Sequence, residues 1–244
     1  MDYRLVIDVG NTSRKFAIFR ERNLTVIHKA KNEVEENAVL QKLNLLKVKS
    51  CIVSASGQIS ISLYQWLESK DFTILYFTSS TSIPLSIKYD TPETLGKDRI
   101  AGAIASLHYF PKGDTITIDM GTCITMNVID DTPAFLGGNI SPGLTMRLRA
   151  MHEFTAQLPM VEKKINETLI GSNTQSALQN GAILGAFWEI ESFIHKIQSK
   201  NKEVNVILTG GDADFFVSYT NIKIFATPNL VLEGLNEILI FNAL

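Results

Sequence analysis

Apolar positions recur with the spacing of strands and then of helices along the first part of the chain. Residues 3–10 and 14–20 are two mainly apolar runs joined by a short polar turn, which is typical of a β-hairpin. Residues 33–46 carry apolar side chains every three or four positions, which predicts a helix. Further predicted elements are strands over 23–28, 50–54 and 73–77 and a helix over 61–66. The order is therefore β-β-β-α-β-α-β.

The second part of the chain repeats this order. The pattern predicts strands over 115–119, 122–129, 133–139, 205–209 and 222–226 and helices over 143–153, 174–199 and 230–241. Between the two parts, residues 78–99 are rich in Ser, Thr and Pro and predict an irregular segment leading into a helix over 99–110. Strands interleaved with helices indicate an α/β protein, and the three leading strands of each half argue against a purely parallel sheet.

Two widely separated turns share the same residue types. Leu5-Val6-Ile7 runs into Asp8-Val9-Gly10-Asn11-Thr12, and Ile116-Thr117-Ile118 runs into Asp119-Met120-Gly121-Thr122. Glycine lets a backbone approach a phosphate, successive N–H groups donate to it, and a carboxylate holds Mg²⁺ through water. One such turn is also compatible with a solvated hairpin. The pair favours two related halves that face each other across a cleft and hold one nucleotide.

Three further motifs are candidates for binding. Residues 137–143 hold three glycines and a proline before a predicted helix, which suits contact with a ligand or simply a turn. Gly210-Gly211 ends a predicted strand and would let an adenine base lie against the backbone. Residues 96–99 follow Tyr89 in the irregular segment, where a second substrate would bind. Asp98 could instead form a surface ion pair with Arg99 or cap a helix that begins at residue 99.

Composition narrows the choice of partners and compartment. Lys and Arg number 23 and Asp and Glu 25, so a net charge of −2 gives no general attraction to nucleic acid or anionic membranes. Two cysteines, Cys51 and Cys123, are no disulfide framework and fit a reducing compartment. The four histidines lack the spacing of metal ligands. Without a signal peptide or an apolar run of roughly 18 residues, we expect a soluble cytoplasmic protein.

Together these motifs resemble the acetate kinase/sugar kinase/Hsp70/actin superfamily. Within it, Gly96-x-Asp98-Arg99, Asp119-x-Gly121-Thr122 and Gly137-Gly138-x-Ile140-x-Pro142-Gly143 are similar to those of type III pantothenate kinases, over essentially the whole chain. The resemblance implies two similar ribonuclease-H-like, actin-like ATPase domains, each a mixed sheet with flanking helices. The expected domains are 1–112, which includes the substrate segment 78–99, and 113–244, with the cleft between them.

The resemblance also implies an activity: ATP-dependent phosphorylation of pantothenate to 4′-phosphopantothenate, the first step of coenzyme A biosynthesis, with Asp98 as general base. The implied ATP-binding residues are Asp8, Val9, Gly10, Asn11, Thr12, Ser13, Arg14, Lys15, Thr122, Gly210 and Gly211. Those implied for pantothenate are Tyr89, Gly96, Lys97, Asp98, Arg99 and Thr174. Asp119 would bind a monovalent cation, K⁺ or NH₄⁺, and Asp8 would hold Mg²⁺ through water. The family resemblance further implies a homodimer.

Two positions depart from the family pattern, and two other functions stay open. Cys123 stands where alanine is more usual, and Lys97 where a small residue is usual, which changes the charge at the substrate site. The alternatives are a kinase for another small alcohol or carboxylate and a non-catalytic nucleotide-binding accessory protein in transcription. The presence of Asp98 and Asp119 favours catalysis.

Overall fold

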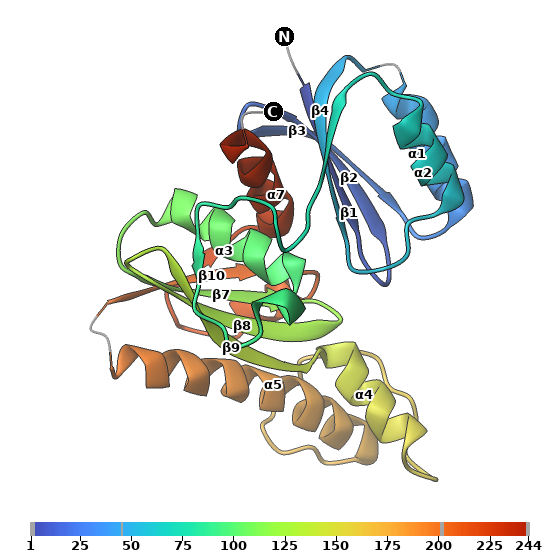
Figure 1. Ribbon diagram of the computed structural model, residues 1–244. Helices are drawn as coiled ribbons and strands as arrows, with labels where there is room; N and C mark the ends of the chain where they lie inside the picture. Colours follow the sequence, from blue (N-terminus) through green and yellow to red (C-terminus); the bar gives the residue numbers. More distant parts are fainter. Residues whose placement is uncertain (1–2, 45, 201–202, 243–244) are drawn as a thin grey trace. The chain divides into compact units, whose positions relative to one another are not determined.

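The chain divides into two compact units. The computed structural model describes residues 3–44, 46–200 and 203–242 (Figure 1). The first unit comprises Met1–Tyr109, Pro133–Phe135 and Leu230–Leu244, and the second comprises Phe110–Thr132 and Leu136–Asn229. The C-terminal helix, expected in the second domain, belongs to the first unit because its contacts are made there.

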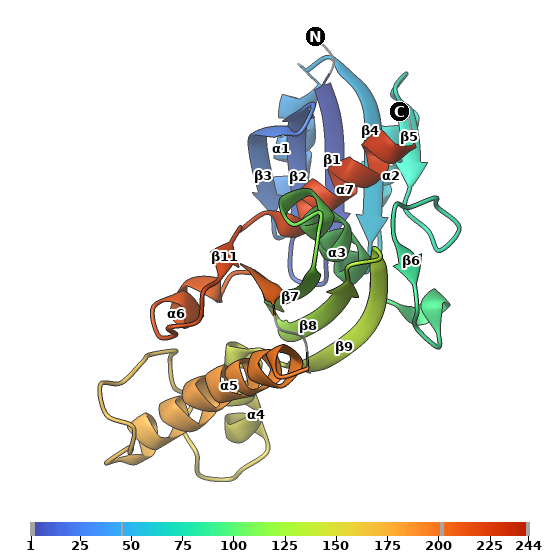
Figure 2. The same cartoon turned by 90° about the vertical axis from the view of Figure 1, so that its left-hand side faces the viewer.

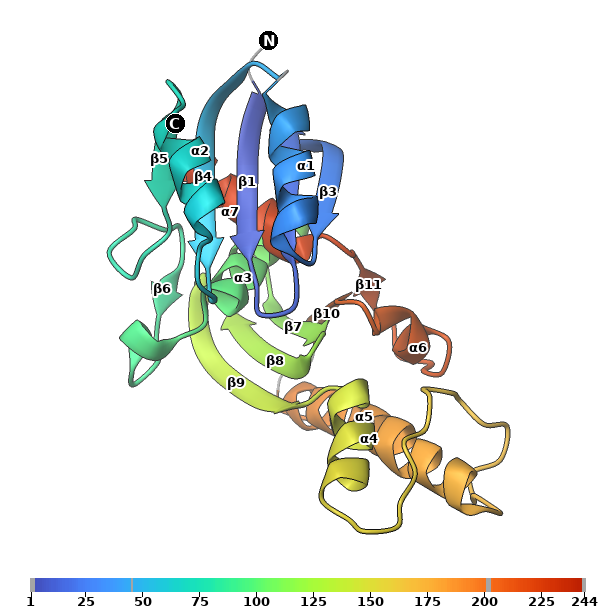
Figure 3. The same ribbon diagram turned by 90° about the vertical axis from the view of Figure 1, so that its right-hand side faces the viewer.

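A five-stranded mixed sheet forms the centre of the first unit (Figure 3). Its strands lie in the order β3-β2-β1-β4-β5; β1, β2 and β3 are antiparallel neighbours, whereas β4 is parallel to β1 and β5 to β4. The strand bounds are β1 Tyr3–Val9, β2 Arg14–Arg20, β3 Asn23–Ala30, β4 Val48–Ala55 and β5 Thr73–Tyr76. The predicted hairpin and the mixed sheet are confirmed.

Helices α1 (Glu33–Leu43) and α2 (Ile61–Glu68) cover one face of this sheet. Alternate residues of β1 and β2, among them Ile7, Val9 and Phe16, are buried in one core with apolar side chains of both helices. Because successive side chains of a strand point to opposite faces, the residues between them lie on the other face. Asp8 and its cross-strand neighbour Lys15 are such residues.

Helices α3 (Lys97–Tyr109) and α7 (Leu230–Phe241) pack against each other in the first unit, and α7 also contacts β1 and β4. The contact is close, since a Cβ atom on Gly234 would lie 1.8 Å from the carbonyl oxygen of Ala101. The Tyr109 hydroxyl donates a hydrogen bond of 2.7 Å to Glu233. These contacts place the C-terminal helix with the first unit.

The second unit repeats the pattern of a hairpin beside a parallel strand (Figure 2). Strands β7 (Asp114–Met120) and β8 (Cys123–Asp130) are antiparallel, and β10 (Val204–Thr209) is parallel to β7. The six-stranded sheet has the order β11-β10-β7-β8-β9-β6, with β6 Ser86–Ile87, β9 Ala134–Pro142 and β11 Phe225–Ala226. Strand β6 and the two β9 residues that pair with it belong to the first unit. Helices α4 (Leu144–Glu153) and α5 (Thr174–Gln198) pack together, and buried side chains of both join a core with β7.

Most predicted elements are present, with small differences. The strand expected over 222–226 is confined to β11, and the irregular segment 78–99 contains β6 and the 3₁₀ turn η1 (Pro92–Thr94). Helix α6 (Ala213–Val217) follows the Gly-Gly motif, where a helix without stated bounds was expected. In the ranges that the structure describes, no helix is both long and apolar enough to cross a membrane.

The packing of α7 on α3 predicts the effect of a single methyl group. We expect Gly234→Ala to lower the free energy of unfolding by about 1–3 kcal/mol, because the added carbon overlaps the Ala101 backbone. Gly181→Ala is the matched control: it lies in α5, its added Cβ meets nothing within 4 Å, and alanine should stabilise the helix by roughly 0.5–1 kcal/mol. Equal melting temperatures for the two variants in calorimetry would contradict this packing.

Candidate active site

The loop that follows β4 supports the first phosphate turn, residues 10–13. The Ser56 and Gly57 amides both donate to the carbonyl of Val9, at 3.0 and 3.3 Å. Within the turn, the Gly10 amide donates to the carbonyl of Ser13 at 3.1 Å. The side chains of the two central residues, Asn11 and Thr12, are solvent-exposed. The turn is therefore fixed through its backbone while its polar side chains face outward, where phosphate oxygens could accept hydrogen bonds.

Asp8, at the end of β1, lies in an unusual electrostatic environment. Burial raises the pKa of its carboxyl group to about 6. The charge of Lys15 lowers this pKa, and the negative charge of Asp98 raises it further. Lys15 and Asp98 are thus both within electrostatic reach of Asp8 in the first unit. A partly buried carboxylate with a raised pKa is stabilised by a proton or by a cation, and a bound Mg²⁺ ion would supply such a cation.

Four of the residues predicted to bind the acceptor, Gly96, Lys97, Asp98 and Arg99, lie at the start of α3. This helix begins at Lys97, so Asp98 lies in its first turn and is not the cap of a helix that begins at 99. Asp98 Oδ1 accepts a hydrogen bond of 2.9 Å from the Arg99 amide and lies 2.6 Å from where a Cβ atom on Gly96 would be. Glycine at 96 therefore leaves room for the Asp98 carboxylate. Lys97 Nζ donates to the carbonyl of Ala55, at the end of β4, at 3.3 Å.

Arg99 is buried, with 5% of its surface exposed, so the alternative of a surface ion pair with Asp98 does not apply. Its guanidinium carbon lies 5.8 Å from the ring centre of Tyr89 and 5.4 Å from that of Phe135. The two rings make an edge contact at 6.1 Å. Sequence reasoning missed Phe135, because it reaches this place through the pairing of β6 with the start of β9. Its aromatic character was the only signal.

In the second unit, Asp119 lies between two glycines. A Cβ atom on Gly210 would lie 2.5 Å from Asp119 Oδ1, and one on Gly121 would lie 3.4 Å from it. Gly210 has φ +102°, a conformation that glycine adopts without strain. The turn at 119–122 and the Gly-Gly motif thus meet at the Asp119 carboxylate.

The glycine-rich segment 137–143 also reaches the second turn. The Gly143 amide donates to the Thr122 carbonyl at 3.1 Å, and a Cβ atom on Gly143 would lie 2.3 Å from the carbonyl oxygen of Gly121. Gly143 is in addition the N-terminal cap of α4. This contact with the predicted phosphate turn argues against the alternative that the segment is a plain turn.

Other predicted residues lie apart from these groups. Arg14 makes an ion pair with Glu36, on the face of the sheet opposite Asp8. Thr174 is exposed at the first position of α5 in the second unit. Beside Gly211, Asp212 forms an ion pair with Lys163, which sequence reasoning did not single out. Lys163 Nζ also lies 5.4 Å from the ring centre of Phe215.

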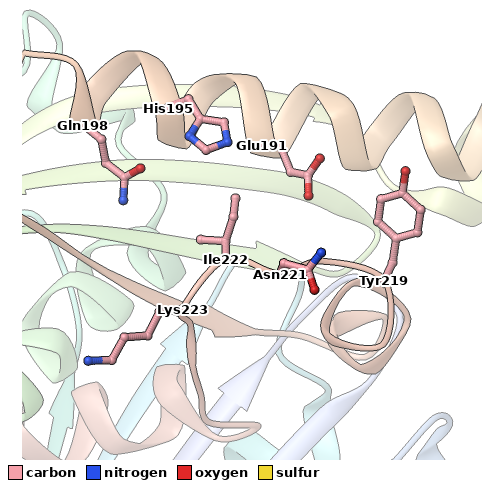
Figure 4. A pocket seen from close by; sticks show the side chains of 7 residues that line it. All are labelled: Glu191, His195, Gln198, Tyr219, Asn221, Ile222 and Lys223. Atoms are coloured by element: carbon pink, nitrogen blue, oxygen red, sulfur yellow. The ribbon is translucent and has the colours of Figure 1, made fainter.

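The described residues contain no cluster of three or more His, Cys, Asp or Glu side chains that could hold a metal ion. The residues do fit a Mg²⁺ ion held by one carboxylate, waters and substrate phosphates, which is how this ion is usually bound in kinases. A separate cavity of about 560 Å³ lies between α5 and the segment before β11 (Figure 4). Its lining side chains are Glu191, His195, Gln198, Tyr219, Asn221, Ile222 and Lys223, none of which was predicted as a site residue.

The order of strands and helices in the two units defines the class of the protein, which has an actin-like ATPase fold. Solved structures share this fold. A Campylobacter jejuni protein assigned to the Baf family of transcriptional activators aligns with a TM-score of 0.62 and 20% identity over 98% of both chains. The activator of the 2-hydroxyisocaproyl-CoA dehydratase from Clostridium difficile, with bound ADPNP, aligns with a TM-score of 0.54 and 12% identity over 99% of this chain and 95% of its own. At these identities the likeness concerns the fold.

Sequence relatives identify the family. The profile of type III pantothenate kinase matches residues 4–196. A type III pantothenate kinase from Bacteroides fragilis (strain YCH46) is 38% identical over 240 residues, covering 98% of each chain. One from Flavobacterium psychrophilum is 34% identical over 236 residues, covering 96% of this chain and 97% of its own. The chain belongs to the type III pantothenate kinase family.

The raised pKa of Asp8 predicts a pH-dependent stability. Because the native state disfavours the ionised form, Asp8 costs stability progressively as pH rises from about 4, its unfolded range, to about 6. We expect Asp8→Asn to match the wild type near pH 4 and to be more stable by roughly 1–3 kcal/mol above pH 6. Thermal unfolding from pH 4 to 8, without nucleotide or Mg²⁺, measures this. Asp71→Asn, an exposed site in the same unit, is the control. A stability difference that does not change with pH would refute the burial of this charge.

Proposed function

We propose that the protein transfers the γ-phosphoryl group of ATP to pantothenate and forms 4′-phosphopantothenate, the first step of coenzyme A biosynthesis. Membership of the type III pantothenate kinase family supports this reaction. The observation that carries the assignment to residues is the electrostatic effect of Asp98, at the start of α3, on the pKa of Asp8 at the end of β1. One carboxylate is then available for the acceptor alcohol while the other serves the phosphate side.

Asp98 acts as the general base in this proposal. Its carboxylate is exposed at the helix start and would accept the proton of the primary hydroxyl as that oxygen attacks phosphorus in line. Lys97 and Arg99 flank it and carry positive charge that suits the carboxylate of pantothenate. Since Arg99 is fixed against two aromatic rings, a bound acceptor would meet a preformed group. Such positioning contributes more to rate than proton transfer alone.

The phosphate groups are assigned to the two turns. The turn at 10–13, Lys15 and Thr122 are assigned to phosphate binding, and Thr122 would donate to a terminal phosphate. Gly210 and Gly211 would face adenine. Asp8 would hold Mg²⁺ through water, and this ion, when bound, neutralises charge that develops on the transferred group. Asp119 would hold K⁺ or NH₄⁺.

We also propose a cytoplasmic homodimer that engages neither membranes nor nucleic acid. Exposed apolar side chains on β9, α4 and α5 of the second unit, namely Leu136, Ile140, Met146 and Trp188, would be covered by a second copy. In this arrangement Thr174 would contribute to the acceptor site. The net charge of −2 gives no general affinity for nucleic acid.

Release of ADP with pantothenate as acceptor tests the function. We expect ATP turnover that depends on pantothenate and is absent with glucose or acetate. Asp98→Asn should lower kcat by about 10²–10⁴-fold while the affinity for nucleotide stays unchanged, because only the proton acceptor is lost. Asp71→Asn should keep wild-type kcat. Turnover with another acceptor alone would refute the substrate, and an active Asp98→Asn enzyme would refute the base.

The role of Asp119 predicts a change in salt dependence. We expect wild-type activity to rise when K⁺ replaces Na⁺ at constant ionic strength, because K⁺ would complete the contacts of the carboxylate. Asp119→Asn should need at least about tenfold more K⁺ for half-maximal activation, since it lacks the charge that binds the ion. Initial rates over a K⁺ series measure this. An unchanged K⁺ requirement in the variant would remove Asp119 from the cation site.

A further inference from the structure

Two neighbouring cations at the start of β2 serve different faces of the sheet. Lys15 pairs across the hairpin with Asp8, and Arg14 pairs with Val9. Val9 belongs to the core beneath α1 and α2, so Arg14 points toward these helices. A slip of one residue in the register of the hairpin would exchange the two faces and bring Arg14 to Asp8.

A buried glutamate receives Arg14. Arg14 Nε lies 3.0 Å from Oε2 of Glu36, an α1 residue with 0% of its surface exposed. The other oxygen of Glu36 accepts hydrogen bonds from the hydroxyls of Ser60 and Ser62, the latter at 3.2 Å. None of the described residues donates a hydrogen bond to Oε2, and its polar contact is the ion pair with Arg14. The charge of Glu36 therefore depends on Arg14 for compensation, and moving Arg14 away would leave this buried charge uncompensated at a high cost in free energy.

The same cluster is continuous with the phosphate turn. Ser60 caps α2, accepting a hydrogen bond of 3.1 Å from the Leu63 amide, while it donates to Glu36. Ser60 ends the loop whose Ser56 and Gly57 amides hold Val9. A Cβ atom on Gly57 would lie 3.4 Å from the carbonyl oxygen of Gly10. Both ends of the phosphate turn thus connect to Glu36: one through Arg14 and the other through the 56–60 loop.

We propose that Glu36 is a positioning residue for ATP: by holding Arg14 on the helix side of the sheet, it keeps Lys15 and the turn at 10–13 aligned with Asp8 for the phosphates. This inference rests on the proposed function, because it concerns how the same nucleotide is held. Glu36 does not touch ATP; its effect passes through Arg14 and the register of the hairpin. It should therefore influence nucleotide binding rather than the acceptor.

Steady-state kinetics of Glu36→Gln test this role. Glutamine keeps an acceptor for the two serines and removes the charge that holds Arg14. We expect KM for ATP to rise about tenfold, with KM for pantothenate within about twofold of the wild type. Leu40→Ala is the matched control: it lies one turn further along α1, is buried in the same core, and should lower the melting temperature without changing KM for ATP.

A second set of variants separates positioning from stability. We expect KM for ATP to rise to the same extent in Arg14→Met, Glu36→Gln and the double variant, because each of them removes the same ion pair. The double variant leaves no buried charge unpaired, so it should melt near the wild-type temperature and remain measurable if a single variant does not fold. A stable double variant with wild-type KM for ATP would overturn the proposal. A rise in KM for ATP in Arg14→Met that is absent in Glu36→Gln would also overturn the proposal, because it would indicate that Arg14 contacts ATP directly.

Failure of the proposed function gives a different result. A folded wild-type protein that binds no MgATP in calorimetry would refute the proposed function and this inference with it. Normal ATP binding by the wild type, together with equal KM changes in Glu36→Gln and Leu40→Ala, would refute only the role of Glu36.

Discussion

The partly buried carboxylate of Asp8 is the group on which the proposed phosphate site of the first unit depends. The sheet places it at the end of β1, where burial opposes its ionisation and the charge of Asp98 adds to the cost. Lys15 compensates part of this cost from the neighbouring strand. A site with such a deficit of positive charge favours a cation. This preference for a cation makes the turn beside Asp8 suitable for a metal-bound triphosphate. Without a cation, the ionised Asp8 lowers the stability of the folded protein at neutral pH.

The alternation of side chains along β2 distributes charge between the two faces of the sheet. Lys15 serves the Asp8 face, and Arg14 compensates the buried charge of Glu36 beneath the helices. Apolar packing alone would not distinguish two adjacent basic residues, since either could extend along its stem toward solvent. A buried acid on one face and a partly buried acid on the other can fix which residue goes where. Support of the phosphate turn and stability of the helix layer therefore share the same residues.

Much of this organisation could be predicted from the sequence, because it is local. Strand alternation, helical spacing and glycine-containing turns gave the hairpins, the helices and the position of residues 8–15 and 119–122. Contacts distant in sequence could not be predicted in this way. The approach of Gly234 to Ala101 places α7 with the first unit, and the pairing of β6 with β9 brings Phe135 to Arg99. Glu36 has the appearance of an ordinary exposed residue on a helix rich in glutamate, and only packing shows it to be buried.

The acceptor side illustrates the same division. The motif at 96–99 predicts which residues bind the acceptor, and the structure adds how they are arranged: Gly96 leaves space for the Asp98 carboxylate, and two rings lie against Arg99. The central claim is that a cation and nucleotide phosphates compensate the charge of Asp8. Titration of this carboxyl group by ¹³C NMR, with and without MgADP, tests it most directly. We expect a pKa of about 6 in the free protein, and a carboxylate that stays ionised to well below pH 5 in the complex. An unchanged pKa on saturation with the nucleotide would contradict the account.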